Sequence, residues 1–93
     1  MKNTNYLLTI IVPTYNEVDN ISNFISKIKE ILKNINFQIL FVDDKSTDGT
    51  IDKINKFKER YDNIELIVRI GRRGLSGACI EGIQNSKSNY VAI

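Results

Sequence analysis

Residues 7–17 read LLTIIVPTYNE, and this stretch decides the fold class. Its first six residues are almost continuously apolar and rich in β-branched side chains, which is typical of a strand covered on both faces of a parallel sheet. We expect Pro13 to end this strand, because proline has no N–H to give to a sheet ladder. A helix is predicted to follow from about Glu17, with Asn16 as its N-cap.

The same alternation continues along the chain. Apolar residues recur at three- and four-residue spacing from Ile21 to Ile35, which predicts one helical stripe. Further strands are predicted at residues 37–42, 64–68 and 90–93, and further helices from about residue 46 or 50 to 61 and from about 76 to 84 or 86. The order β-α-β-α-β-α-β predicts a Rossmann-like α/β domain with three α/β/α layers, a parallel sheet and right-handed crossovers.

Length and composition bound the possible functions. Ninety-three residues suffice for one core, and 42% hydrophobic with 26% charged residues is ordinary for a globular domain. One cysteine and no histidine exclude an internal disulfide, a Ser-His-Asp triad and a histidine-ligated metal within this chain. A net charge of +2 is too small to indicate nucleic-acid binding. No apolar run approaches the roughly 18 residues of a membrane span, so we expect a cytoplasmic protein.

Ligands of open α/β sheets bind beyond the carboxyl ends of the strands. Those ends fall at residues 13–17, 42–44 and 69–77, and all three segments are strongly polar. Glycines 71, 74 and 77 have the spacing GxxGxxG and follow the third strand, which disfavours a dinucleotide fold whose GxGxxG follows the first strand. A phospho-accepting receiver domain is also disfavoured, because residues 68–70 contain no aspartate.

Asp43 and Asp44 allow two interpretations. One carboxylate could cap the following turn while the other is solvated, or one could accept hydrogen bonds from a nucleotide base or ribose. Adjacent residues of an extended strand point to opposite faces, so the two cannot both face one ligand. Asp44 lies further into the loop, and we predict that it is the ligand-facing residue.

Five other residues at this edge keep a structural and a functional interpretation. Tyr15 could stack on a flat ligand or be an ordinary loop aromatic. Glu17 could reach a base or ribose, or only favour a helix N-terminus. Arg69 and the pair Arg72 and Arg73 could neutralise phosphates or simply be solvated.

Three segments together resemble the signatures of family-2 glycosyltransferases. Residues 10–17, IIVPTYNE, are similar to the opening strand and its PTYNE motif; residues 42–50, VDDKSTDGT, are similar to the VDDxSTDGT element; and residues 69–78 are similar to the segment after the third strand. Residues 89–93 resemble the strand that leads to a metal-binding D-x-D motif. The PTYNE and GLSGA runs resemble those of one subgroup, the polyprenyl-phosphate (dolichol-phosphate) mannosyl- or glucosyltransferases. Lys45 departs from the pattern, because glycine or a small polar residue is common there.

The resemblance implies a GT-A fold whose nucleotide-binding half has the sheet order 3-2-1-4. It implies that Pro13, Tyr15 and Glu17 line the nucleotide pocket, that Asp44 contacts the base, and that Arg69 lies near the donor. We predict that Asp43 also belongs to the nucleotide-sugar-binding residues. The implied reaction transfers a sugar, with inversion, from a UDP- or GDP-linked donor to an acceptor such as a polyprenyl phosphate.

The D-x-D motif itself does not occur in this sequence. We therefore expect residues 1–93 to be the N-terminal nucleotide-sugar-binding part of a glycosyltransferase domain, inactive alone and without a catalytic residue or metal ligand. Relatives imply Mg²⁺ or Mn²⁺ in a full-length enzyme and contact with a membrane only through other parts or a lipid acceptor. The alternative is a nucleotide-binding or interaction module without catalysis.

We also predict that copies of this chain associate. An apolar strand at residues 90–93, left at the edge of a parallel sheet with an uncovered apolar face, invites pairing between molecules. Light scattering of the purified chain at high concentration should show dimers or larger assemblies. A stably folded monomer under those conditions would contradict this prediction.

Overall fold

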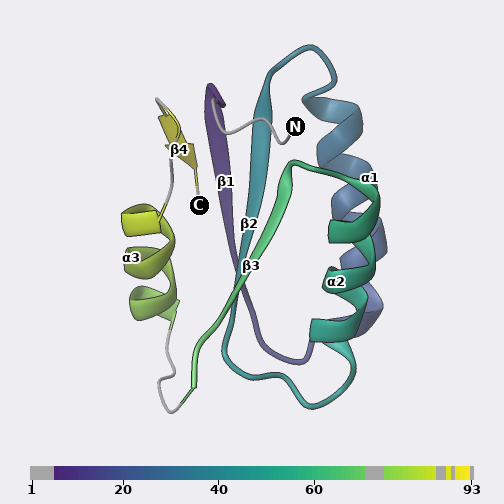
Figure 1. The fold of residues 1–93 in the computed structure, drawn as a ribbon, viewed down its shortest axis with the longest axis vertical. Coiled ribbons are helices and arrows are strands. Elements are labelled where there is room, and N and C mark those ends of the chain that lie inside the picture. Colours follow the sequence, from purple (N-terminus) through teal and green to yellow (C-terminus); the bar gives the residue numbers. More distant parts are fainter. Residues whose placement is uncertain (1–5, 71–74, 86–87, 89, 93) are drawn as a thin grey trace.

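The computed structural model describes residues 6–70, 75–85, 88 and 90–92, without the side chains of residues 75, 76, 81, 84 and 85. Its elements in chain order are β1 (Leu8–Thr14), a 3-10 turn η1 (Val18–Asn20), α1 (Ile21–Ile31), β2 (Phe37–Asp43), α2 (Thr50–Arg60), β3 (Ile64–Val68), α3 (Leu75–Asn85) and β4 (Tyr90–Ala92). The strands form one parallel sheet in the order β3-β2-β1-β4 (Figure 1). The predicted α/β class and sheet order are confirmed.

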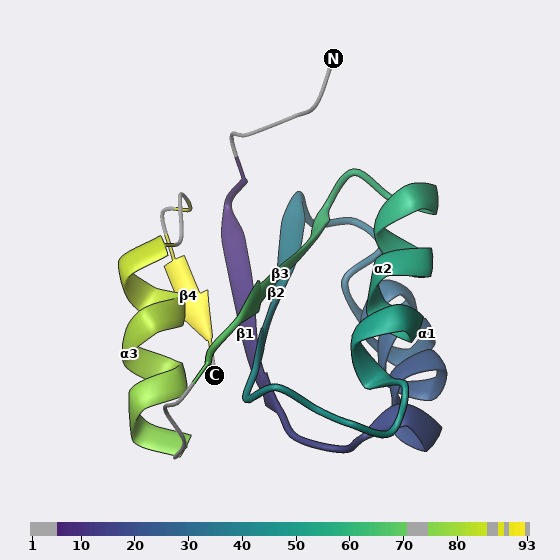
Figure 2. The ribbon, with the colours of Figure 1, turned by 60° about the horizontal axis from the view of Figure 1, so that its bottom comes forward.

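Helices cover both faces of the sheet, with α1 and α2 on one side and α3 on the other (Figures 1 and 2). The first face carries Phe37, Ile39 and Phe41 of β2, which pack against isoleucines of α1 and α2. The opposite face carries Leu40 and Val42, which pack in a second cluster that includes Ala78 of α3. Because β2 is buried on both faces, its residues 39–42 are continuously apolar rather than alternating.

Pro13 does not end the first strand, contrary to the prediction. β1 continues to Thr14, and Pro13 lies opposite Val42 in the pairing with β2. The carbonyl of Thr14 accepts a hydrogen bond from the N–H of Asp44, on the side of β2. Successive residues of a strand direct their backbone groups to opposite sides, so those of Pro13 are directed to the side of β4. The described part of β4 pairs only with residues 8–10 of β1. The missing N–H of proline therefore interrupts no described ladder bond.

The first helix begins later and ends earlier than predicted. Asn16 is not its N-cap: its backbone is left-handed (φ 53°), and its side-chain oxygen accepts a hydrogen bond from Thr47 instead. A 3-10 turn comes first, and α1 begins at Ile21. The helix ends at Ile31, which is 73% exposed, so the predicted apolar stripe does not continue to Ile35.

Helix α3 lies close to β1 because Gly82 has no side chain. A Cβ atom built at Gly82 would lie 2.4 Å from the Cγ2 of Ile11 and 3.0 Å from its Cδ1. Ile11 is itself almost fully buried in the second core cluster. The glycine therefore sets how closely this helix approaches the sheet.

The substitution Gly82→Ala should destabilise the fold by about 1–3 kcal/mol, because the added methyl group overpacks the contact with Ile11. Urea unfolding monitored by circular dichroism measures the change. The matched control is Ile83→Ala on the exposed side of the same helix, which should change stability much less. Equal losses in both variants would contradict a close contact at Gly82.

Candidate functional site

Two loops meet at the carboxyl edge of the sheet: residues 15–20 after β1 and residues 44–49 after β2. Asp43, the last residue of β2, joins them. Its side chain is fully buried, and its Oδ1 accepts hydrogen bonds from the hydroxyl groups of Thr14 (2.6 Å) and Ser46 (2.6 Å). Its Oδ2 accepts a hydrogen bond from the N–H of Ser46 (2.7 Å). Asp43 thus caps the turn that follows it, which agrees with the structural interpretation of this residue.

Ser46 extends this network to the first loop. Its hydroxyl donates to Asp43 and accepts a hydrogen bond from the N–H of Asn16 (2.8 Å). The side-chain oxygen of Asn16 in turn accepts from the N–H of Thr47 (2.9 Å). This pair of bonds holds Asn16 in its left-handed conformation and fixes the two loops to each other.

Asp48 and Thr50 make a second link between the loops. Oδ2 of Asp48 accepts from the N–H of Val18 (3.2 Å), and the Thr50 hydroxyl accepts from the N–H of Glu17 (2.9 Å). The hydrogen bond that the Thr50 hydroxyl donates to Asp48 is the main cause that lowers the pKa of Asp48 below its ordinary value, and the N–H groups of Val18 and Thr50 add to this effect. The link thus contributes fully above about pH 4 and weakens as the pH falls through that lowered pKa.

Asp44 faces away from this network and forms an ion pair. Its Oδ1 lies 3.2 Å from Nη1 of Arg69, the residue that directly follows β3. The side chain of Asp44 is 12% exposed and that of Arg69 is 4% exposed. The two adjacent aspartates therefore have different partners, as the alternation along a strand requires.

Three further predicted residues lie at the end of β1 and in the loop that follows it. The side chain of Tyr15 is 42% exposed at this edge. Pro13 and Glu17 line a recess of about 120 Å³ together with residues of β1, β2 and α1, and Oε2 of Glu17 accepts a hydrogen bond from the side-chain amide of Asn20 (2.8 Å). The recess is too small to enclose a nucleotide, since ligand pockets measure roughly 300–1,000 Å³. A ligand of that size would lie across the open edge.

The predicted site residues thus fall into three separate sets of contacts. The structure joins Asp44 to Arg69, places Pro13 and Glu17 around one recess, and assigns Asp43 to the loop network. Arg72 and Arg73 lie outside the described residues. Sequence reasoning did not single out the roles of Asn16, Ser46, Asp48 and Thr50, although the run of short polar residues after β2 signals side-chain bonds to the backbone. It also missed the contact between Gly77 and Arg69, which joins residues from two elements.

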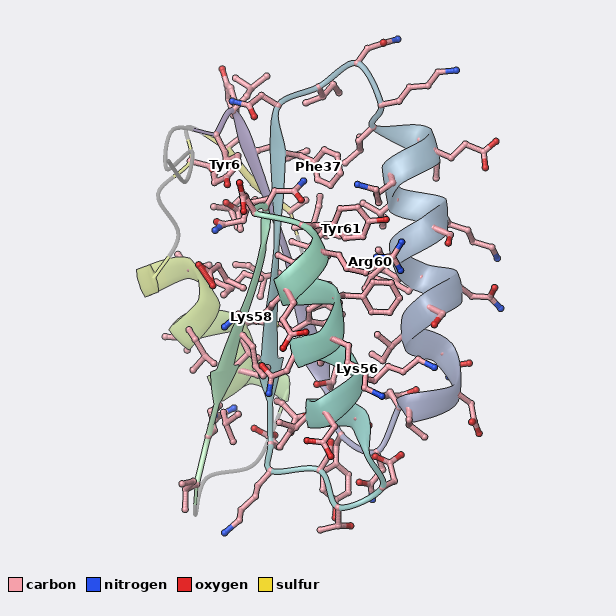
Figure 3. The ribbon with its side chains drawn as sticks, turned by 45° about the vertical axis from the view of Figure 1, so that its right-hand side comes forward. Tyr6, Phe37, Lys56, Lys58, Arg60 and Tyr61 are labelled. Atoms are coloured by element: carbon pink, nitrogen blue, oxygen red, sulfur yellow. The ribbon has the colours of Figure 1, made fainter. Side chains whose placement is uncertain are left out.

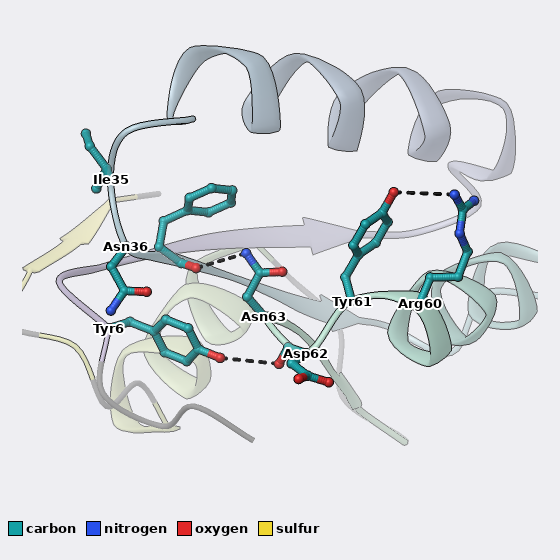
Figure 4. A pocket seen from close by; sticks show the side chains of 8 residues that line it. Tyr6, Ile35, Asn36, Arg60, Tyr61, Asp62 and Asn63 are labelled. Atoms are coloured by element: carbon teal, nitrogen blue, oxygen red, sulfur yellow. Dashed lines mark hydrogen bonds between the residues drawn. The ribbon is translucent and has the colours of Figure 1, made fainter. Parts of the chain in front are cut away.

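A larger recess, of about 360 Å³, lies at the opposite edge of the sheet between the ends of α1 and α2 and the starts of β1, β2 and β3 (Figures 3 and 4). Its polar groups bond to one another: the Tyr6 hydroxyl donates to the Asp62 carbonyl, the Asn63 amide to the Phe37 carbonyl, and the Arg60 guanidinium to the Tyr61 hydroxyl. Burial, together with the charge of Asp62, raises the pKa of Tyr6. This edge is stabilised by its own contacts, and the polar carboxyl edge remains the candidate site.

Among the residues with described positions, no group of three or more aspartate, glutamate, cysteine or histidine residues could hold a metal ion. In the same part of the chain, no helix is long and apolar enough to cross a membrane.

The parallel sheet order β3-β2-β1-β4, with a polar network and an ion pair at its carboxyl edge, is that of an open α/β domain, whose ligands bind at this edge. The sequence profile of glycosyl transferase family 2 matches residues 9–93. The chain belongs to this family, as its motifs predicted.

Named relatives include two dolichol-phosphate mannosyltransferases. The protein from Pyrococcus furiosus is 33% identical over 92% of this chain, and the one from Saccharomyces cerevisiae is 32% identical over 89%. A poly(ribitol-phosphate) beta-glucosyltransferase from Bacillus spizizenii is 34% identical over 90%. The chain spans 24%, 32% and 14% of these three proteins, respectively.

A solved structure is also similar: the mannosyltransferase PcManGT from Pyrobaculum calidifontis in complex with GDP-Man and Mn²⁺. It matches with a TM-score of 0.71 and 26% identity, over 94% of this chain and 27% of that protein. This match confirms the predicted GT-A type of fold.

Lys45, where the sequence departs from the family pattern, has a left-handed backbone (φ 57°). This conformation costs a residue with a Cβ roughly 1–2 kcal/mol, and glycine avoids that cost. Lys45→Gly should therefore raise the free energy of unfolding by about 0.5–1 kcal/mol, after the greater entropy of glycine in the unfolded chain is subtracted.

Chemical denaturation measures this gain. The matched control is Lys56→Gly, at an exposed position inside α2, which should lower stability by about 1 kcal/mol. A loss of stability in Lys45→Gly similar to that of the control would show that the left-handed conformation at residue 45 carries no cost.

Proposed function

We propose that residues 1–93 form the nucleotide-sugar-binding part of a glycosyltransferase domain that uses a nucleotide-diphosphate sugar. The observation that carries the proposal is the Asp44 carboxylate, held 3.2 Å from the buried Arg69 at the carboxyl edge of the sheet. Membership in glycosyl transferase family 2 supports the reaction class, and the complex of the solved relative with GDP-Man supports a nucleotide sugar as ligand.

Each predicted residue then has a chemical task. Asp44 accepts hydrogen bonds from the N–H groups of the base, which guanine and uracil both offer. The exposed ring of Tyr15 stacks on the base or ribose, and the Glu17 carboxylate accepts hydrogen bonds from ribose hydroxyl groups. Pro13 lines the recess below them, and Arg69 supports Asp44. Asp43 acts only through the loops, because its oxygens already accept three protein hydrogen bonds.

The metal ion of the related complex has no matching ligand group among the residues that the structure describes. In a full-length enzyme, we propose that Mg²⁺ or Mn²⁺ and the residues that transfer the sugar with inversion are supplied outside the described part of this chain.

We further propose a polyprenyl phosphate as the acceptor. This is supported by the names of two relatives, both dolichol-phosphate mannosyltransferases. A lipid acceptor would bring the full-length protein to the cytoplasmic face of a membrane.

An NMR titration of the 93-residue chain with GDP, UDP and NADH tests the donor site. We expect amide shifts around Tyr15, Glu17 and Asp44 with GDP or UDP, and the responding diphosphate identifies the base. In Asp44→Ala the affinity should fall about tenfold or more, because one hydrogen bond to a charged group is lost. The control is Asp62→Ala, which removes an exposed carboxylate at the opposite edge and should leave the shifts unchanged.

Two results would contradict the proposal. Shifts with NADH alone would indicate a dinucleotide site. The absence of amide shifts with all three ligands would show that these residues do not form a donor site by themselves.

A further inference from the structure

We propose that Arg69 is a positioning residue, which acts on the nucleotide only through Asp44, and that Gly77 provides the space it needs. The inference rests on the proposed function, because it concerns how Asp44 meets the base. It assigns to Arg69 a role different from neutralising the donor phosphates, which its charge alone would suggest.

Asp44 and Arg69 differ in how much of each side chain is exposed to solvent. The carboxylate side chain of Asp44 keeps 12% of its surface accessible, whereas the Arg69 side chain keeps 4%. The guanidinium therefore lies on the protein side of the pair and the carboxylate on the solvent side. A ligand that approaches this edge meets Asp44 first.

The guanidinium also lies close to the first turn of α3, with Nη2 nearest to Gly77. A Cβ atom built at Gly77 would lie 2.6 Å from Nη2, 3.3 Å from Cζ and 3.4 Å from Nη1 of Arg69. Because the Cζ and both terminal nitrogens approach the same backbone position, the helix holds the guanidinium against Asp44. A methyl group at residue 77 would have to displace it.

Backbone hydrogen bonds fix both ends of the pair. The N–H of Arg69 donates to the Asp43 carbonyl (2.7 Å), and the N–H of Asp44 donates to the Thr14 carbonyl (3.0 Å). These bonds attach the ion pair to the ends of β1, β2 and β3. The close approach of Gly77 also places the pair against α3. Arginine suits this place because its planar, permanently charged head combines an ion pair with close packing on a backbone. The orientation of the Asp44 carboxylate follows from that packing.

The preference for one base distinguishes a residue that positions Asp44 from one that contacts the diphosphate or only stabilises the fold. Guanine and uracil offer a ring N–H to a carboxylate, whereas adenine offers a ring-nitrogen acceptor at the corresponding edge. A residue that orients Asp44 should change the ratio of the dissociation constants of ADP and the preferred diphosphate. A residue that reads the diphosphate, or that only stabilises the fold, should weaken both nucleotides alike.

Calorimetry on the 93-residue chain with GDP, UDP and ADP tests the inference through a double-mutant cycle. We expect Arg69→Met and Asp44→Asn each to lower the preference over ADP about tenfold, and the double variant to lower it no further. Gly77→Ala, which keeps both charged side chains, should also lower the preference over ADP. Arg60→Met, an exposed arginine at the opposite edge, is the matched control and should leave the ratio unchanged.

The outcomes are distinguishable. If wild type binds neither GDP nor UDP, the proposed function fails and this inference fails with it. If wild type binds but the effects of Arg69→Met and Asp44→Asn multiply to about a hundredfold, Arg69 contacts the nucleotide itself and the inference alone is wrong. Equal weakening of ADP and the preferred diphosphate in Arg69→Met also overturns it. If Arg69→Met does not fold, the preference over ADP is measured in the double variant and in Gly77→Ala, and these two values test the inference.

Discussion

The buried carboxyl group of Asp43 is the constraint on which the carboxyl edge of this sheet depends. A carboxyl group without solvent contact must find partners within the protein, and it finds them in Thr14 and Ser46. Ser46 then has to accept its hydrogen bond from Asn16, which places the first loop against the second. The conformation of two loops thus follows from the burial of one acidic group at the end of a strand.

This arrangement gives the two adjacent carboxyl groups different surroundings. Asp43 belongs to the face of the helices α1 and α2, and its neighbour Asp44 belongs to the face of α3, where Arg69 and Gly77 lie. The first carboxyl group makes the loops rigid, and the second stays at the open edge. A rigid support with one accessible acceptor is the kind of preorganisation that a nucleotide base requires.

The class of fold and the sheet edge were predictable, because β-branched runs and helical stripes alternate along residues 7–92 and the family motifs fall at strand ends. Pro13 and Asn16 were interpreted wrongly because each was judged alone. Whether a proline interrupts a ladder depends on which neighbour its backbone faces, and whether an asparagine caps a helix depends on competing donors such as Thr47. The contact of Gly77 with Arg69 joins residues eight positions apart through packing, which no local pattern records.

The strand order also has a consequence for how the chain assembles. Among the described strands, β1 comes first in the chain, yet its two neighbours are β2 and the distant β4, with Leu8 opposite both Phe37 and Tyr90. Parallel pairing between such distant segments is slow, because the intervening chain must be ordered first. During synthesis, one edge of β1 therefore stays open until residues 90–92 have emerged, and an open strand edge is exposed to wrong pairing during this period.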